Sequence, residues 1–101
     1  MTTIRLSAVA RSEFLKEVAY YEDIQKGLGG RFRKATTAAF LKSAEFPLRG
    51  KPGIADTRRV LVDGFPFSIV YKVEKTGIVV HAVAHLSRKP AYWLERLSDS
   101  S

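Results

Sequence analysis

The two histidines are the first residues of this sequence whose type and spacing suggest chemistry. His81 and His85 lie four residues apart in an apolar run, and on a β-strand this spacing places both side chains on the same face. Two imidazoles can begin a metal site, but the sequence has no cysteine and no third histidine to complete it. We therefore expect no metal and no cofactor. His81, between Val79 and Val83, is expected to be partly buried, whereas His85 at the end of the strand has either a structural or a functional role.

Basic residues form two clusters along the chain. The 101 residues include 17 Lys and Arg but only 10 Asp and Glu, which gives a formal net charge of +7. This excess favours an anionic partner, either a nucleic acid or an acidic protein. The clusters fall in residues 49–59 and 85–96, and their bases are Arg49, Lys51, Arg58, Arg59, Arg88, Lys89 and Arg96.

Arg59 and Trp93 each have two possible roles. Arg59 either faces an anionic partner in a groove or forms a salt bridge with an acid such as Glu17 or Glu22, because a guanidinium fits carboxylate and phosphate equally. Trp93 is expected to fix the C-terminal segment to the sheet, and the alternative is exposed contact with a partner. Tyr71 is expected in the core, with its hydroxyl at the rim.

Composition excludes several classes of protein. Hydrophobic residues make up 46% and charged residues 27%, as in globular proteins, and the length predicts one domain over residues 1–101. The absence of cysteine excludes a disulfide scaffold and a thiol nucleophile. No apolar run approaches the roughly 18–20 residues that cross a membrane. The N-terminal sequence has no secretory signal pattern, so we expect a cytoplasmic protein without membrane contact.

The first half of the chain predicts a short strand followed by two antiparallel helices. The strand covers residues 4–6, and Ser7 then caps a helix that runs from Ala8 to about Lys26. Gly27–Gly30 is expected to form the turn, and a second helix runs from Arg31 to Phe46, before Pro47. The apolar positions at helical spacing, which should face a common core, are Ala10, Phe14, Leu15, Val18, Tyr21, Ile24, Leu28, Phe32, Ala35, Ala39 and Phe46.

The second half predicts an antiparallel meander after a basic loop at residues 48–57. Three strands are expected at Arg58–Val62, Phe67–Glu74 and Ile78–Leu86. Pro90 then opens a short helix over Ala91–Leu97. The expected fold class is α+β: an N-terminal strand, an αα-hairpin, a three-stranded antiparallel meander and a short C-terminal helix, with the helices packed on one face of the sheet.

With this order of elements, the sequence resembles toxins of the RelE/ParE superfamily, from bacterial type II toxin–antitoxin modules. The resemblance covers nearly the whole chain. The segments that carry it are Tyr20-Tyr21-Glu22, Leu28-Gly29-Gly30-Arg31-Phe32, Arg58-Arg59, Phe65-Pro66-Phe67-Ser68-Ile69-Val70-Tyr71, His85, Arg88-Lys89-Pro90-Ala91-Tyr92-Trp93 and Arg96. The long helical hairpin and the His…Arg-x-Pro-x-Tyr-Trp ending are more similar to the ParE branch than to the RelE branch.

The resemblance implies a cytoplasmic growth inhibitor that is held inactive, in a hetero-oligomer, by a cognate ParD-like antitoxin encoded nearby. ParE-type toxins inhibit DNA gyrase and RelE-type toxins cleave messenger RNA on the ribosome, so the implied target is gyrase or the ribosome. A third possibility is an inactive member that keeps antitoxin binding. The residues expected to bind the target or the antitoxin are Arg58, Arg59, Arg88, Tyr92, Trp93 and Arg96.

The ribonuclease alternative implies a catalytic set. Metal-independent cleavage needs a base for the ribose 2′-hydroxyl, cations for the phosphorane charge and an acid for the leaving oxygen. The set that the resemblance implies is Lys51, Arg59, His85, Arg88 and Tyr92. The sequence does not reproduce the lysine pair that precedes the first central strand in the RelE branch. We therefore expect a non-catalytic gyrase inhibitor, with a ribosome-dependent mRNA endoribonuclease as the alternative.

Overall fold

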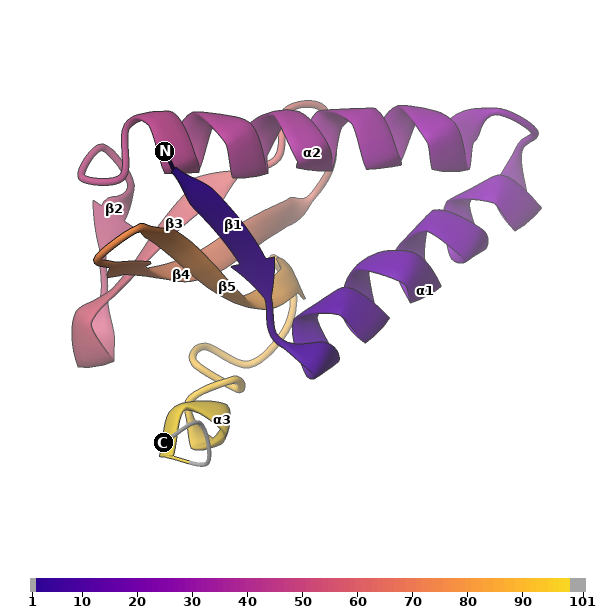
Figure 1. Cartoon of the computed structure of the whole chain (residues 1–101). Coiled ribbons are helices and arrows are strands. Elements are labelled where there is room, and N and C mark those ends of the chain that lie inside the picture. Colours follow the sequence, from indigo (N-terminus) through magenta and orange to yellow (C-terminus); the bar gives the residue numbers. More distant parts are fainter. Residues whose placement is uncertain (1, 99–101) are drawn as a thin grey trace.

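The computed structural model describes residues 2–98, and these residues form an α+β fold (Figure 1). The two long helices pack on one face of a five-stranded sheet, and the C-terminal segment packs on the other face. The predicted fold class is confirmed. The elements in chain order are β1 (Thr3–Leu6), α1 (Ala8–Ile24), α2 (Leu28–Glu45), β2 (Lys51–Pro52), the 3-10 turn η1 (Ile54–Asp56), β3 (Thr57–Leu61), β4 (Phe67–Glu74), β5 (Gly77–His85) and α3 (Glu95–Ser98).

The sheet has the strand order β1-β5-β4-β3-β2, so β5 lies between β1 and β4. β3, β4 and β5 form the predicted antiparallel meander, and β1 runs parallel to β5 on its outer side. The prediction of a loop over residues 48–57 is wrong in part, because Lys51 and Pro52 pair with Arg59 and Arg58 as β2. A strand of two residues shows no alternation in the sequence, so it cannot be recognised without its partner β3.

The turn of the helical hairpin is shorter than the predicted Gly27–Gly30. Gly27 takes a left-handed conformation with φ 88°, and α2 already begins at the next residue. Gly29 lies inside the helix, where a Cβ would collide with the backbone oxygen of Val18, so this glycine permits close contact between the two helices. The Glu22 carboxylate accepts hydrogen bonds from the amides of Gly27 and Gly29 and stabilises the start of α2.

The main core lies between the helical hairpin and the sheet. Phe14, Phe32 and Ala39 are buried as predicted, and Val18 packs against them partly buried. Phe32 is fully buried in an aromatic cluster. The rings that contact it are those of Phe14, Tyr21, Phe65 and Phe67.

Three of the apolar positions predicted to face the core are exposed instead. Leu15, Ile24 and Phe46 have exposed fractions of 45%, 56% and 40%. Leu15 is turned about 100° around α1 from the buried Phe14, and Ile24 lies near the end of the hairpin that extends beyond the sheet (Figure 1). Phe46 is the C-cap of α2, where its ring lies under the Arg49 guanidinium at 4.4 Å.

The C-terminal segment packs on the face of the sheet that α1 and α2 leave free. Trp93 is 9% exposed and packs against Val70 and Ala82, so it fixes the segment to the sheet as expected. The predicted helix over Ala91–Leu97 is wrong in extent, because its first residues form turns and α3 is confined to Glu95–Ser98. None of the helices within residues 2–98 is long and apolar enough to cross a membrane.

Candidate binding site on the helix-free face of the sheet

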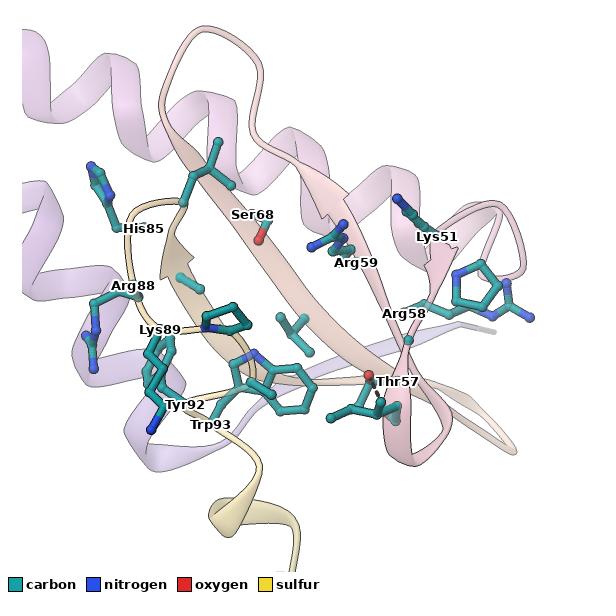
Figure 2. A pocket seen from close by; sticks show the side chains of 18 residues that line it. Lys51, Thr57, Arg58, Arg59, Ser68, His85, Arg88, Lys89, Tyr92 and Trp93 are labelled. Carbon is teal, nitrogen blue, oxygen red and sulfur yellow. Dashed lines mark hydrogen bonds between the residues drawn. The ribbon is translucent and has the colours of Figure 1, made fainter.

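Cross-strand pairing places Lys51 and Arg59 on the helix-free face. Lys51 is opposite Arg59, Arg59 is opposite Val70, and Val70 is opposite Ala82. Directly paired residues point to the same side of a sheet. Because Val70 and Ala82 pack against Trp93, the two cations share a face with this indole. The face has a cavity of about 380 Å³ (Figure 2), which we call the basic cavity after its charged lining of Lys51, Arg58, Arg59, Arg88 and Lys89.

Arg59 is available to an anion from outside the chain. The alternative salt bridge to Glu17 or Glu22 is wrong, because these acids lie on α1, on the other side of the sheet, and Glu22 binds the first amides of α2. Within residues 2–98, neither Arg59 nor the opposite Lys51 forms a salt bridge, and no acidic residue of this range lines the basic cavity.

Arg58 binds the neighbouring loop rather than facing the centre of the cavity. Its guanidinium donates to the carbonyl oxygens of Leu48 and Gly50 at 3.0 and 2.9 Å. The same loop is held by Tyr71, whose hydroxyl donates to the carbonyl oxygen of Pro47 at 2.7 Å. The Tyr71 ring is fully buried with its hydroxyl at the edge of the core, as predicted, and burial raises the pKa of this phenol. Arg58 therefore positions the loop that leads into β2.

A carboxylate that the sequence analysis did not single out holds the C-terminal side of the cavity. Glu13 on α1 accepts hydrogen bonds from two nitrogens of Arg96 at 2.9 and 2.8 Å, from the Tyr92 hydroxyl at 2.7 Å and from the Val83 amide at 3.1 Å. Burial raises the pKa of Glu13, but these hydrogen bonds outweigh burial and hold the pKa below its ordinary value. We call Glu13, Tyr92 and Arg96 the Glu13 cluster.

Tyr92 and Arg96 are occupied within the Glu13 cluster. Burial, followed by the hydrogen bond to Glu13, raises the pKa of Tyr92 to about 12. Arg96 also donates to the carbonyl oxygen of His81 at 3.1 Å, and it does not line the basic cavity. Arg88 does line it, and its guanidinium lies over the Tyr92 ring at 3.8 Å from the centroid, which is a cation–π contact.

His85 and His81 point to opposite faces of the sheet, which corrects the prediction of a shared face. The register of β4 and β5 shifts between Val70 and Tyr71, and this bulge leaves His81 without a direct partner in β4. One extra residue reverses the alternation of side chains along a strand. His85 therefore pairs with Phe67 on the side of the helices, although its position at the end of β5 keeps it at the rim of the basic cavity.

The His85 ring is engaged in local contacts. Its centroid lies 5.0 Å from that of Phe67, edge to face, and its Nδ1 accepts a hydrogen bond from the Ser87 amide at 3.0 Å. In Figure 2 the ring is directed away from the Lys51 and Arg59 side chains. Because Nδ1 accepts from a backbone amide, the proton of the neutral ring lies on Nε2, which leaves the ring a donor at that atom and no free lone pair for a base in these contacts.

His81 is more deeply buried than expected. It is 6% exposed on the helix-free face, where it lines a second hollow with Arg5 and Lys72. Burial and the charge of Lys72 lower the pKa of His81. Within residues 2–98, no group of three acidic or histidine side chains is arranged to hold a metal ion.

Comparison with solved structures identifies the class of fold. The chain is similar to a chain of the structure titled "Chromosomal ParDE TA system from P. aeruginosa", with a TM-score of 0.73 over 84% of this chain and 96% of that chain, at 12% sequence identity. At this identity the likeness shows the fold alone. The model of the family described as "ParE toxin of type II toxin-antitoxin system, parDE" matches residues 4–90. The chain belongs to this ParE toxin family, and membership implies an antitoxin partner. No curated protein matches the chain.

The structure brings together most, but not all, of the residues singled out in the sequence. Those that line the basic cavity are Lys51, Arg58, Arg59, His85, Arg88, Tyr92 and Trp93. Arg96 does not line the cavity, because its guanidinium is bound to Glu13 in the Glu13 cluster. Glu13 was missed because it sits beside the buried Phe14 among ordinary charged positions of α1, and nothing in the local sequence indicates a partner near the C-terminus.

Proposed function

We propose that this protein is the toxin of a cytoplasmic type II toxin–antitoxin pair, that residues 1–101 form its single toxin domain, and that it inhibits DNA gyrase by binding rather than by catalysis. A ParD-like antitoxin encoded nearby neutralises it in a hetero-oligomer. The observation that carries the proposal is that the hydrogen bonds of the Glu13 cluster, beside the basic cavity, occupy the Tyr92 hydroxyl. Within residues 2–98, Lys51 and Arg59 of the cavity form no salt bridge, whereas the Tyr92 hydroxyl, which would be suited to proton transfer, already donates to Glu13.

Tyr92 is poorly suited to act as a general acid. Its hydroxyl donates to Glu13 at 2.7 Å, so protonating a leaving group would require breaking this hydrogen bond. Its pKa of about 12 also lies far from the range in which proton transfer is efficient at neutral pH. Lys51 and Arg59 need no such rearrangement in order to bind an anionic surface.

The alternative function is ribosome-dependent cleavage of messenger RNA. It is favoured by the position of His85 at the rim of a cavity that also contains the cations Lys51, Arg59 and Arg88. In that mechanism His85 would have to give up the hydrogen bond from the Ser87 amide to Nδ1 in order to act as the base, and the cations would stabilise the phosphorane.

Inducible expression of the toxin without its antitoxin separates the two functions. Growth, gyrase supercoiling with purified protein, and the integrity of ribosome-bound messages are measured for the wild type and for His85→Gln and Tyr92→Phe, after each variant is shown to fold. Lost supercoiling with intact messages supports the proposal. Cleaved messages whose cutting disappears in folded His85→Gln or Tyr92→Phe would overturn it in favour of the ribonuclease.

A further inference from the structure

Lys51 and Arg59 form a like-charge pair that the fold alone does not explain. They are directly opposite each other in the β2–β3 ladder, both are exposed, and no carboxylate within residues 2–98 lies between them. Like charges opposite each other in a sheet destabilise it. An anion placed over the pair would remove this repulsion and gain two charge-assisted hydrogen bonds.

A second pair of cations lies on the other side of the same cavity. Figure 2 shows Arg88 and Lys89 on the C-terminal segment, across the cavity from Lys51 and Arg59. The Tyr92 ring holds the Arg88 guanidinium at 3.8 Å and so limits its freedom. The cavity therefore has two separated positions for negative charge, one of them pre-organised.

Apolar surface lies between and beside these cations. Val70 and Ala84 contribute to the floor, and Ile54 and Leu86 line the cavity with exposed fractions of 52% and 54%. Leu61 lies on the same face of β3 as Arg59 and is 65% exposed. Exposed aliphatic side chains around a charged site favour a ligand that is itself partly apolar.

We propose that the basic cavity binds an acidic segment of a partner protein whose carboxylates alternate with aliphatic side chains. The carboxylates lie on the Lys51–Arg59 pair and on Arg88 and Lys89, and the aliphatic groups cover Ile54 and Leu86. The inference deepens the proposed function and rests on it in one respect, which is that the partner is a protein.

The lining disfavours a single-stranded nucleic acid as the occupant. Binding of unpaired bases relies on exposed aromatic rings for stacking. Trp93 is 9% exposed and packs on the sheet, and the Tyr92 ring is covered by Arg88. The aromatic rings of the lining are thus already in contact with the sheet or with Arg88, and the exposed side chains Ile54 and Leu86 beside the cations are aliphatic.

Fluorescence anisotropy with three labelled probes tests the inference on the full chain. The probes are a peptide of Glu-Glu-Leu repeats, a peptide of the same length and charge with Ser in place of Leu, and an oligothymidylate of similar length. We expect the leucine peptide to bind about tenfold more tightly than either other probe, because a tenfold change corresponds to about 1.4 kcal/mol, which a few buried methylenes supply.

Matched variants locate the binding. Lys51→Ala and Arg59→Ala should each weaken binding of the leucine peptide about tenfold. Lys34→Ala and Arg33→Ala remove the same charges from the exposed surface of α2 and should change it less than about twofold. Thermal melting checks that all four variants fold.

Three results would overturn the inference. Equal binding of the leucine and serine peptides removes the apolar contribution, tightest binding of oligothymidylate indicates a nucleic-acid surface, and equal effects of the cavity and α2 variants remove the cavity as the site. The same wild-type preparation is assayed for inhibition of gyrase supercoiling. Failure of the peptide test with gyrase inhibition intact removes only this inference, whereas absent inhibition with peptide binding intact removes only the proposed target.

Discussion

Glu13 on α1 and Arg96 in α3, which are 83 positions apart in the chain, form an ion pair that closes the unpaired edge of β5. β1 pairs with β5 only as far as Val80. Beyond that point the Val83 amide donates to Glu13, and the carbonyl oxygen of His81 accepts from Arg96. The two side chains therefore take the hydrogen-bonding positions that a longer β1 would occupy, and they fix the C-terminal segment against the edge.

Replacing the Glu13 carboxylate should loosen the C-terminal segment. Glu13→Gln keeps the size of the side chain but removes the charge that Arg96 and Tyr92 share, and we expect a loss of about 2 kcal/mol in the free energy of unfolding. Urea titration measures the loss. Glu45→Gln at the exposed end of α2 is the matched control and should change stability by less than about 0.5 kcal/mol. Equal effects of the two substitutions would show that the cluster contributes nothing.

The Glu13 cluster should also make stability depend on pH in the acidic range. The folded-state pKa of Glu13 lies below its ordinary value, so folding favours the ionised form. The resulting stabilisation is fully present above about pH 5 and is lost as the pH falls through the folded-state pKa. The difference in unfolding free energy between the wild type and Glu13→Gln should therefore shrink between about pH 5 and 3. A difference in unfolding free energy that stays constant over this range contradicts the lowered pKa of Glu13. Because both proteins contain His81, taking the difference between them cancels the contribution of that histidine to the pH dependence.

Local sequence patterns predict the elements well, because each depends on neighbouring residues. The alternation at Phe67, Ile69 and Tyr71 places β4 correctly, and the helical spacing of Phe14 and Phe32 locates the core. The hairpin of α1 and α2 follows from the glycine turn, which lies between two segments whose apolar residues recur at helical spacing.

Features that depend on distant pairing were not predictable in this way. The bulge at His81 is a property of the β4–β5 register, and it alone places His85 on the side of the helices. The salt bridge of Glu13 with Arg96 requires the C-terminal segment to return to α1, which no local signal indicates. The position of Arg59 beside Lys51 likewise depends on the two-residue strand β2.

The aromatic core should be sensitive to truncation at its centre. Phe32 is fully buried among other aromatic rings, so Phe32→Ala should cost roughly 3 to 5 kcal/mol in denaturant titration. Leu41→Ala on the same helix is the control, because Leu41 is 59% exposed and should lose less than about 1 kcal/mol. A loss below about 1 kcal/mol for Phe32→Ala would mean that the centre of the core has been misassigned.

The antitoxin should bind tightly and with strong dependence on salt. The net charge of +7 favours an acidic partner, and so do Lys51 and Arg59 of the basic cavity, which form no salt bridge within residues 2–98. We expect association of nanomolar class, on the order of −12 kcal/mol, with a rate that falls as ionic strength rises. Titration calorimetry and stopped-flow mixing at low and high salt measure both quantities. A purified cognate antitoxin that leaves the toxin free at micromolar concentration contradicts this expectation.

Toxicity should depend on the cations of the basic cavity rather than on a titrating side chain. Arg59→Glu and Arg88→Glu reverse charges that lie at the cavity and have no carboxylate partner within residues 2–98, so each should weaken gyrase inhibition about tenfold or more. Arg33→Glu, the same reversal on the exposed surface of α2, should retain inhibition. Arg96→Glu is uninformative about contact with a partner unless stability is measured as well, because Arg96 holds Glu13 and its reversal should unfold the C-terminal segment.

Folded His85→Gln should keep much of the gyrase inhibition, whereas general acid–base catalysis predicts a loss of about a hundredfold in the rate of the catalysed reaction for that variant. A binding inhibitor therefore keeps its effect on supercoiling in folded His85→Gln, whereas a ribonuclease leaves supercoiling unchanged and loses message cleavage in that variant. The supercoiling and message-integrity assays, run with equal amounts of folded protein, separate the two functions.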